Sequence, residues 1–204
     1  LSNETLKLAV HTDADSLSAN KSSVQLFFQE GDVWKLRREA IVDPLTAMAT
    51  FRLEDWDHDQ DVAYRLTLGE SSFEGRIRPE PTKTQSLKLM AVACVNDKWF
   101  PYEDAVKQMI DQDPDIVFFA GDQIYESNAG GEVIYANDAA EVPAAMANYL
   151  AKWRKFGLTF RDLLKDRPSI VITDDHDVYA NDLWGDGGRR MTGDRTTGGY
   201  NMHP

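Results

Sequence analysis

The pattern that most constrains the fold begins near residue 87, where apolar runs start to alternate with amphipathic segments. Three runs have the length and β-branched content of buried strands: LKLMAVAC (87–94), DIVFFA (115–120) and SIVIT (169–173). Segments with helical spacing separate them, at 101–112, 142–157 and 159–166. Strands that alternate with crossover helices indicate a parallel sheet buried on both faces. We therefore predict an α/β domain over residues 86–204.

The first 85 residues follow a different pattern, in which short alternating runs are broken by turn residues. These runs are KLAVHTDA (7–14), SSVQLFFQEGD (22–32), MATFRLEDWDHDQD (48–61) and DVAYRLTLGESSFEGRIRPEP (61–81). Period-two alternation at this spacing predicts an N-terminal antiparallel β-sandwich of the fibronectin or immunoglobulin type over residues 1–85. The polar, proline-containing segment RPEPTKTQS (78–86) is predicted to link the two domains.

Composition limits the classes of partner. Among 204 residues, 22 lysines and arginines stand against 34 aspartates and glutamates, a net charge of −12, which argues against binding to duplex nucleic acid. No uncharged apolar run approaches the roughly 18 residues of a membrane span. The single cysteine, Cys94, excludes an intrachain disulfide.

Metal-capable and acid/base side chains follow each of the three predicted parallel strands. Cys94 follows the first, Asp122 and Tyr125 follow the second, and Asp174-Asp175-His176-Asp177 follows the third. Ligands of open parallel sheets bind outside the carboxyl ends of the strands, so these side chains are expected to converge. A thiolate, carboxylates, a phenol and an imidazole suit a transition metal with a harder cation beside it.

Each of these residues also has a simple structural interpretation. Cys94 alone is typical of a small buried apolar residue, and Gly121-Asp122 alone is typical of a turn or helix cap. Tyr125 alone is typical of a packing residue whose hydroxyl is hydrogen-bonded. The four titratable groups of 174–177 are harder to explain, because they would repel one another without a cation. Together, the simple interpretations require three coincidences at one sheet edge.

The order and spacing of these motifs resemble the metallophosphoesterase superfamily, and within it the alkaline phosphatase D (PhoD-like) family. Gly121-Asp122 with Tyr125 matches the Gly-Asp-x-x-Tyr motif. Cys94-Val95-Asn96 looks like the cysteine variant of the Asp-x-His motif, and 174–177 stands where the superfamily has Gly-Asn-His-Asp. The resemblance spans residues 87–188 and, more weakly, the N-terminal sandwich.

The resemblance implies a phosphomonoesterase or phosphodiesterase with two metal ions, by analogy ferric iron (Fe3+) and calcium (Ca2+), with Zn2+ or Mn2+ as alternatives. Asp122 would bridge the ions, Cys94 and Tyr125 would bind the iron, and Asp175 would be a further ligand. His176 would act on the substrate, and metal-activated water would attack phosphorus in line. The family resemblance also implies a location outside the cytoplasm.

Other candidates rank lower. Asp174 is interpreted as a carboxylate that orients His176, and Asp177 as a surface cap; the residues alone leave both interpretations open. Asn181 and Asp182 would line the site or form a turn, and Arg189 and Arg190 would reach a phosphate or stay solvated. His58 is assigned to a charged hairpin turn, and KWRKF (152–156) to one face of a helix; His11 and His203 have no supporting context.

Further expectations follow from the resemblance and from the family motifs that this sequence does not contain. Such enzymes complete the metal site with histidines from later strands, so we expect this chain, which ends at Pro204, to be an N-terminal fragment that is marginally stable and binds metals poorly. A non-catalytic metal-binding module with a partner-binding sandwich is the main alternative. A nucleotide-binding α/β protein is disfavoured because no Gly-x-Gly-x-x-Gly or Gly-x-x-x-x-Gly-Lys loop follows the first strand.

Overall fold

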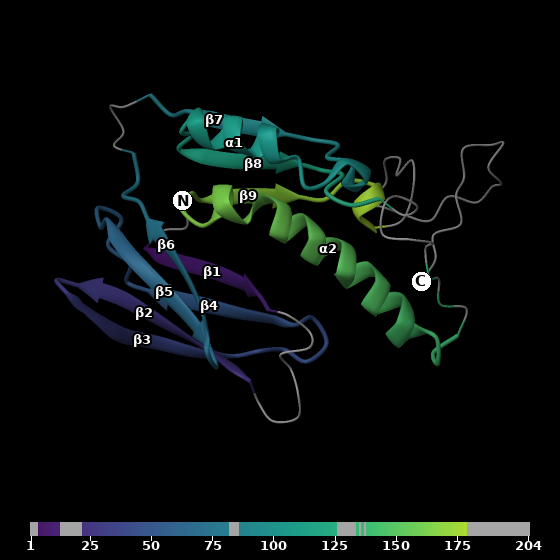
Figure 1. Cartoon of the computed structure of the whole chain (residues 1–204), viewed down its shortest axis with the longest axis horizontal. Coiled ribbons are helices and arrows are strands. Elements are labelled where there is room, and N and C mark those ends of the chain that lie inside the picture. Colours follow the sequence, from purple (N-terminus) through teal and green to yellow (C-terminus); the bar gives the residue numbers. More distant parts are fainter. Residues whose placement is uncertain are drawn as a thin grey trace. The chain divides into compact units, whose positions relative to one another are not determined.

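The computed structural model describes residues 4–12, 22–81, 86–125, 134, 136 and 138–178 (Figure 1). The chain forms two compact units, and each is described by itself. Unit 1 comprises Leu1–Leu87 with Lys165–Arg167, and unit 2 comprises Lys88–Leu164 with Pro168–Pro204.

Unit 1 contains two antiparallel sheets among its described residues. One pairs β1 (Thr5–His11) with β4 (Met48–Glu54). The other has the order β3-β2-β5-β6, formed by β3 (Val33–Ile41), β2 (Ser23–Glu30), β5 (Val62–Leu68) and β6 (Ser71–Ile77). The predicted antiparallel strands are confirmed, whereas the assignment to an immunoglobulin-like or fibronectin-like sandwich stays a prediction.

Side chains from both sheets of unit 1 share one apolar core. On β2, Val24, Leu26 and Phe28 are buried at alternate positions, as the period-two pattern predicts. Phe51 of β4 and Leu66 of β5 belong to the same cluster, so the two sheets are joined by packing as well as by the chain.

Two details of unit 1 differ from the sequence-based expectations. Strand β3 is not among the alternating runs, because its charged sequence VWKLRREAI leaves most of its residues exposed. The turn at His58 connects β4 to β5, which lie in different sheets, so its assignment to a hairpin was wrong. His58 Nδ1 lies 3.1 Å from Glu80 Oε1, and its Nε2 accepts a 2.8 Å hydrogen bond from the Glu4 amide.

Unit 2 is built on a three-stranded parallel sheet, as predicted. The order is β7-β8-β9, formed by β7 (Leu89–Val92), β8 (Ile116–Ala120) and β9 (Ser169–Ile172). Helix α1 (Glu103–Asp111) connects β7 to β8, and helix α2 (Val142–Leu164) lies between β8 and β9 in the chain. Two short 3-10 helices, η2 (Asp97–Trp99) and η3 (His176–Val178), follow β7 and β9.

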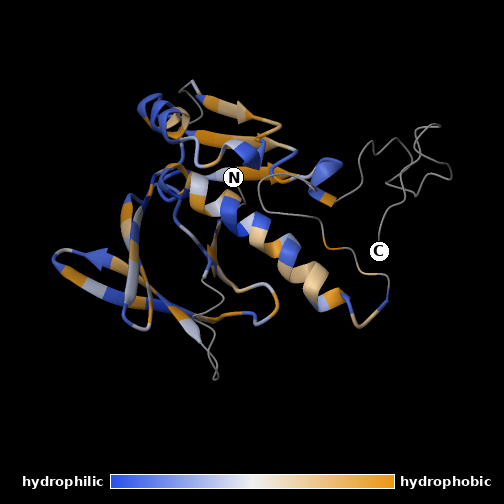
Figure 2. Cartoon of the chain, turned by 45° about the vertical axis from the view of Figure 1, so that its right-hand side comes forward, coloured by the Kyte–Doolittle hydropathy of each residue, from blue (hydrophilic) through white to orange (hydrophobic). Residues whose placement is uncertain are grey.

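Both helices of unit 2 pack against the same face of its sheet. Val117 and Phe119, two residues apart on β8, are fully buried in a cluster with Val106 of α1 and Phe160 of α2. Every residue of β9 is exposed, including Ile170 at 42%. The strands of the parallel sheet are nevertheless largely coloured as hydrophobic in Figure 2. The predicted burial on both faces is therefore wrong for β9, because none of its residues belongs to the described apolar cluster that the two helices form with β8.

Helix α2 is one continuous element of 23 residues, although the sequence pattern divided it at Leu158. Gly157 lies inside it, at a cost of about 1 kcal/mol relative to alanine. Its neighbours Phe156 and Phe160 are 5% and 0% exposed, so their packing offsets that cost. Among the helices described, we find none with the length and apolar character that crossing a membrane demands.

Candidate metal centre

The backbone at the carboxyl ends of β7 and β8 brings Cys94 and Asp122 together. The Cys94 amide donates to Gly121 O at 3.1 Å and the Val95 amide donates to Asp122 O at 3.0 Å, which extends the contact of the strands beyond their last paired residues. Cys94 and Asp122 have φ values of 54° and 56°, in the left-handed region. Such conformations persist only where surrounding contacts hold them, and they cluster at functional sites.

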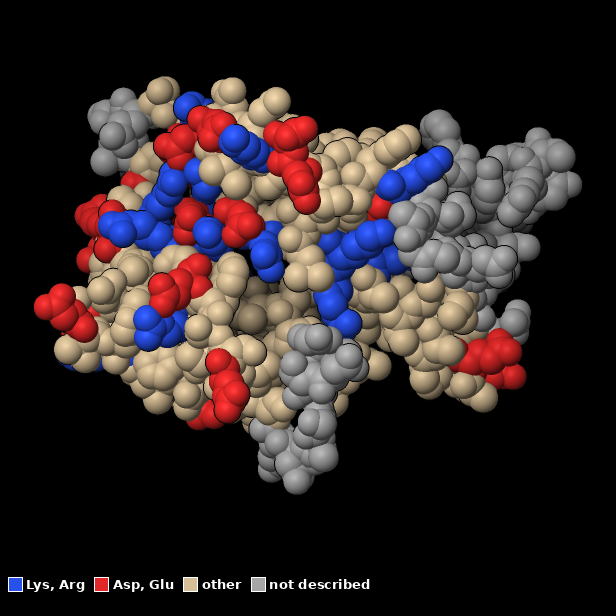
Figure 3. Space-filling model, in the orientation of Figure 1, with Lys and Arg blue, Asp and Glu red and all other residues tan. Residues whose placement is uncertain are grey.

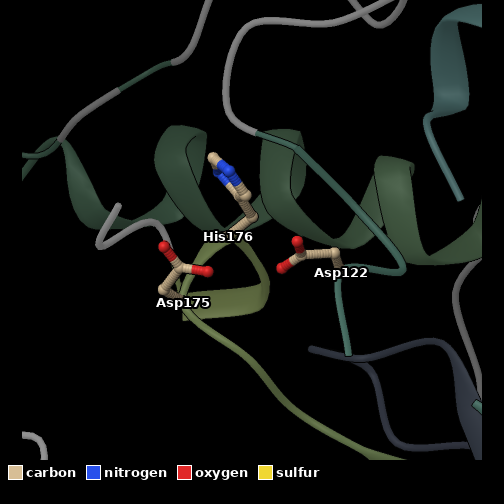
Figure 4. Close-up of side chains that lie close together, drawn as sticks. All are labelled: Asp122, Asp175 and His176. Atoms are coloured by element: carbon tan, nitrogen blue, oxygen red, sulfur yellow. The ribbon is translucent and has the colours of Figure 1, made fainter. Parts of the chain in front are cut away.

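The side chains of all five predicted site residues gather at this edge of the sheet. The Cys94 thiol lies 3.6 Å from Asp122 Oδ2, and the Tyr125 hydroxyl donates to the same oxygen at 3.3 Å. The Tyr125 and His176 rings lie 4.4 Å apart, centroid to centroid. Ligand-capable atoms of Asp122, Asp175 and His176 all lie within 4.8 Å of one another (Figure 4).

In the metal-free chain, the surroundings raise the pKa of three of these groups above their ordinary values. Burial raises the pKa of the Asp122 carboxyl; His176 opposes this effect and Asp175 adds to it. Cys94 is exposed as a residue, yet partial desolvation of its thiol, followed by the charge of Asp122, raises its pKa. Burial and Asp122 likewise raise the pKa of Tyr125. A bound cation would reverse these tendencies, because it favours the anionic form of each group.

An unsatisfied oxygen supports a cation at this place. Asp122 Oδ1 is buried and has no hydrogen-bond partner in the described structure, whereas Oδ2 accepts from Cys94 and Tyr125. Leaving a buried carboxylate oxygen without a partner costs about 1–3 kcal/mol or more. A metal ion would satisfy it, and the surrounding carboxylate, imidazole, thiol and phenol groups fit such an ion.

Asp177 is buried and joins two loops of this centre. Its interpretation as a cap on the surface was therefore wrong. Its side chain is 0% exposed. Oδ1 accepts hydrogen bonds from the amides of Gln123 and Ile124, at 2.8 and 3.2 Å. Oδ2 accepts from the amides of Asp122 and Asp174, at 2.8 and 3.0 Å. One carboxylate thus joins the loop after β8 to the loop after β9.

Gly121 allows these two loops to approach closely. Its φ is +100°, and a Cβ atom at this position would come within 2.5 Å of Asp174 Cβ. Asp174 Oδ1 accepts a 2.9 Å hydrogen bond from the Asp175 amide. The suggestion that Asp174 orients His176 stays a prediction.

The sequence patterns missed several residues that support the centre. Lys152, in the KWRKF segment assigned to one helix face, is 1% exposed and donates to Tyr125 O at 2.8 Å. Asn96, the last residue of the Cys-x-Asn motif, caps η2 by accepting from the Lys98 amide at 2.9 Å. A lysine among apolar residues of a helix was the one available signal for Lys152. The remaining candidates, Asn181, Asp182, Arg189, Arg190 and His203, lie outside the described residues.

The fold and the site define an α/β unit with a candidate acidic metal centre at the carboxyl ends of its parallel strands. The model of one family, described as PhoD-like phosphatase, matches residues 89–202, more than half of the chain. The chain therefore belongs to the PhoD-like phosphatase family, as the sequence motifs indicated. Comparison with curated proteins gave no match.

Proposed function

We propose that this protein is a metal-dependent phosphoesterase that hydrolyses phosphate monoesters or diesters. Family membership supports a phosphatase-type function in general terms. The observation that carries the finer proposal is the convergence of Asp122, Asp175 and His176 within 4.8 Å, with Cys94 and Tyr125 both on Asp122 Oδ2. Residues 86–204 would form the catalytic domain, acting outside the cytoplasm as the family resemblance implies.

In this proposal Cys94, Asp122, Tyr125 and Asp175 hold two cations. Asp122 has two carboxylate oxygens, so it can serve both ions. The anionic thiolate and phenolate favour a strongly Lewis-acidic ion such as ferric iron, whereas Asp175 favours a harder one such as calcium. When bound, the ions would activate water for in-line attack and stabilise the entering and leaving oxygens.

His176 is proposed to act directly on the substrate. Its ring stacks at a tilt of 36° on the Tyr125 ring and is only partly buried, so it remains accessible. An imidazole can donate a hydrogen bond to a phosphoryl oxygen or, when protonated, protonate a leaving alkoxide. General acid catalysis of this kind contributes about 10²–10⁴-fold to the rate.

Hydrolysis of p-nitrophenyl phosphate and bis(p-nitrophenyl) phosphate, with Fe3+ and Ca2+ or Mn2+ supplied, tests the proposal. We expect Asp122→Asn to abolish metal-dependent turnover and His176→Ala to lower kcat about 10²-fold or more while metal binding persists. Asp111→Asn and His11→Ala are the matched controls, because Asp111 ends α1 and His11 lies on β1, both exposed and outside the candidate centre.

The outcomes separate the competing functions. Wild-type rates in both site variants would refute the assignment of these residues. Metal binding that depends on Asp122, without hydrolysis of either ester, would favour the non-catalytic metal-binding module instead.

A further inference from the structure

Helix α2 carries three hydrogen-bond donors at successive intervals of three residues, and each bonds the backbone of a different strand-end loop. The Tyr149 hydroxyl donates to Asp177 O at 2.7 Å, in the segment after β9. Lys152 Nζ donates to Tyr125 O at 2.8 Å, in the segment after β8. Lys155 Nζ donates to Asp97 O at 3.4 Å, in the segment after β7. These are the three segments that carry the predicted metal ligands.

The burial of Lys152 and of the Asp97 carboxylate shows that this side of α2 is not an ordinary solvated helix face. Lys152 is 1% exposed, and a buried ammonium group is costly unless it is hydrogen-bonded. The Asp97 carboxylate is 0% exposed and has no hydrogen-bond partner in the described structure. Burial raises its pKa, and the nearby charges of Lys155 and Lys152 oppose that effect. Replacing a buried charged set of this kind with well-packed apolar residues is often neutral or even stabilising. The stability of the core alone therefore does not explain why these residues are present.

The loops that these donors reach contain backbone strain. Cys94 and Asp122 both have positive φ values. Residues in that region hold their conformation only where the surrounding structure over-determines it. Asp177 already fixes four amides of two of the loops, and the Tyr149 hydroxyl in turn fixes the Asp177 carbonyl. The three donors therefore complete a network that extends from one rigid helix to every loop of the centre.

We infer that Tyr149, Lys152 and Lys155 are positioning residues, which set the spacing of the metal ligands by bonding one carbonyl of each ligand-bearing loop to α2. The consequence of this positioning for metal binding rests on the proposed function. Loss of a group that orients a metal ligand typically alters metal affinity about 10–100-fold. The positioning itself is a property of the chain without metal.

Amide hydrogen exchange of the metal-free chain tests the positioning directly. Tyr149→Phe removes the hydroxyl donor and keeps the ring. Lys152→Met removes the ammonium donor and keeps most of the side-chain volume. We expect exchange at Asp122–Ile124 and Asp174 to accelerate relative to the β8 amides. The acceleration should be about tenfold or more in Lys152→Met, which loses a hydrogen bond from a charged group, and about two- to tenfold in Tyr149→Phe, which loses a neutral one. Arg161→Gln removes an exposed charge from the same helix and should leave these amides unchanged.

Titration of the same variants, and of Lys155→Gln, with Mn2+ alone tests the consequence for metal binding. We expect Tyr149→Phe and Lys152→Met to weaken Mn2+ binding at least tenfold, Lys155→Gln to weaken it less because its bond is longer, and Arg161→Gln to have no effect. Unchanged loop exchange in a folded Tyr149→Phe variant would overturn the inference, even if Lys152→Met failed to fold. If loop exchange became faster while the affinity for Mn2+ stayed at the wild-type value, the link between loop positioning and the metal centre would be overturned. If the full-length protein hydrolysed neither ester with metal supplied, the proposed function would fail, while the exchange measurement would still decide the positioning.

Discussion

Gly121 shows how much a single residue determines at this centre. It has a positive φ, and it leaves space for Asp174 where any side chain would collide with it. Two separate penalties therefore apply to a substitution. The strained conformation costs about 1–2 kcal/mol for an L-residue, and overpacking costs about 1–3 kcal/mol.

We expect Gly121→Ala to destabilise unit 2 by about 2–5 kcal/mol, the sum of those penalties. Gly31→Ala is the matched control, because Gly31 has a φ of +61° with no atom within 4 Å of the added Cβ, so only the conformational penalty applies. Urea unfolding, with hydrogen exchange to read each unit, would measure both. Equal losses in the two variants would show that the approach of Asp174 is not tight.

The Asp177 carboxylate accepts four amide hydrogen bonds from two loops of the centre. Asparagine at this position could accept hydrogen bonds only through one oxygen, leaving two of the four amides facing an NH2 group. We expect Asp177→Asn to destabilise unit 2 by about 3–5 kcal/mol, because hydrogen bonds to a charged group contribute about 1.5–3 kcal/mol each.

Asp174→Asn provides the comparison for Asp177→Asn, since the exposed Asp174 carboxylate accepts one amide hydrogen bond, from its neighbour Asp175. That variant should lose under about 1 kcal/mol. Thermal or urea unfolding of the two proteins at pH 7 would measure the contrast. A small loss in Asp177→Asn would mean that the loops can rearrange to satisfy their own amides.

At the scale of elements, the strands of unit 2 differ sharply in how much they contribute to the core. Phe119 on β8 is 0% exposed and packs edge-to-face on Phe156 and Phe160, at 4.9 and 5.1 Å between ring centroids. Ile170 on β9 is 42% exposed. We expect Phe119→Ala to cost about 3–5 kcal/mol and Ile170→Ala about 1 kcal/mol or less, measured by urea unfolding. Similar losses would indicate that β9 is covered in solution.

The same contrast explains how far the sequence could predict these elements. Apolar run length located all three parallel strands, and helical spacing located α1 and α2. The pattern could not show that both helices cover one face, because Ile170, Val171 and Ile172 are as apolar as the buried residues of β8. Strand β3 was missed for the opposite reason, since its side chains contribute little to the core.

The candidate centre was predictable to the extent that its residues lie at strand ends. Cys94, Asp122 and Asp175 follow apolar runs, and parallel topology requires such ends to converge. The role of Asp177 was not predictable, because it bonds amides 53–55 residues away. Lys152 was missed because its apolar neighbours on the helix are only a weak local signal that a lysine is buried.

At the scale of the whole molecule, the charge balance is acidic, yet basic residues are also present at the surface. Lysine and arginine are intermingled with aspartate and glutamate on the face shown in Figure 3, although the net charge is −12. Mixed charge of this kind favours solubility without forming a broad field of one sign. The expectation that duplex nucleic acid is not a partner stays a prediction.

Stability at alkaline pH should depend on a buried tyrosine of unit 1. Tyr64 on β5 is 4% exposed, and its hydroxyl donates to Lys165 O at 2.8 Å. Burial, with a smaller contribution from Asp166, raises the pKa of Tyr64 to about 12. Because the folded state holds this proton more tightly than the unfolded chain, its stability is fully present below the unfolded pKa of about 10 and is lost as the pH rises through 12.

Comparison of the wild type with Tyr64→Phe across this range isolates the effect. Near pH 8 the variant should be less stable by about 1 kcal/mol, because it lacks the hydrogen bond to Lys165. Between pH 10 and 12 the wild type should lose about 2 kcal/mol relative to the variant, since one pKa unit corresponds to about 1.4 kcal/mol. The order of stability should then invert. Urea unfolding at each pH measures the difference, and parallel curves for the two proteins would show that the Tyr64 hydroxyl is accessible to water in the folded state.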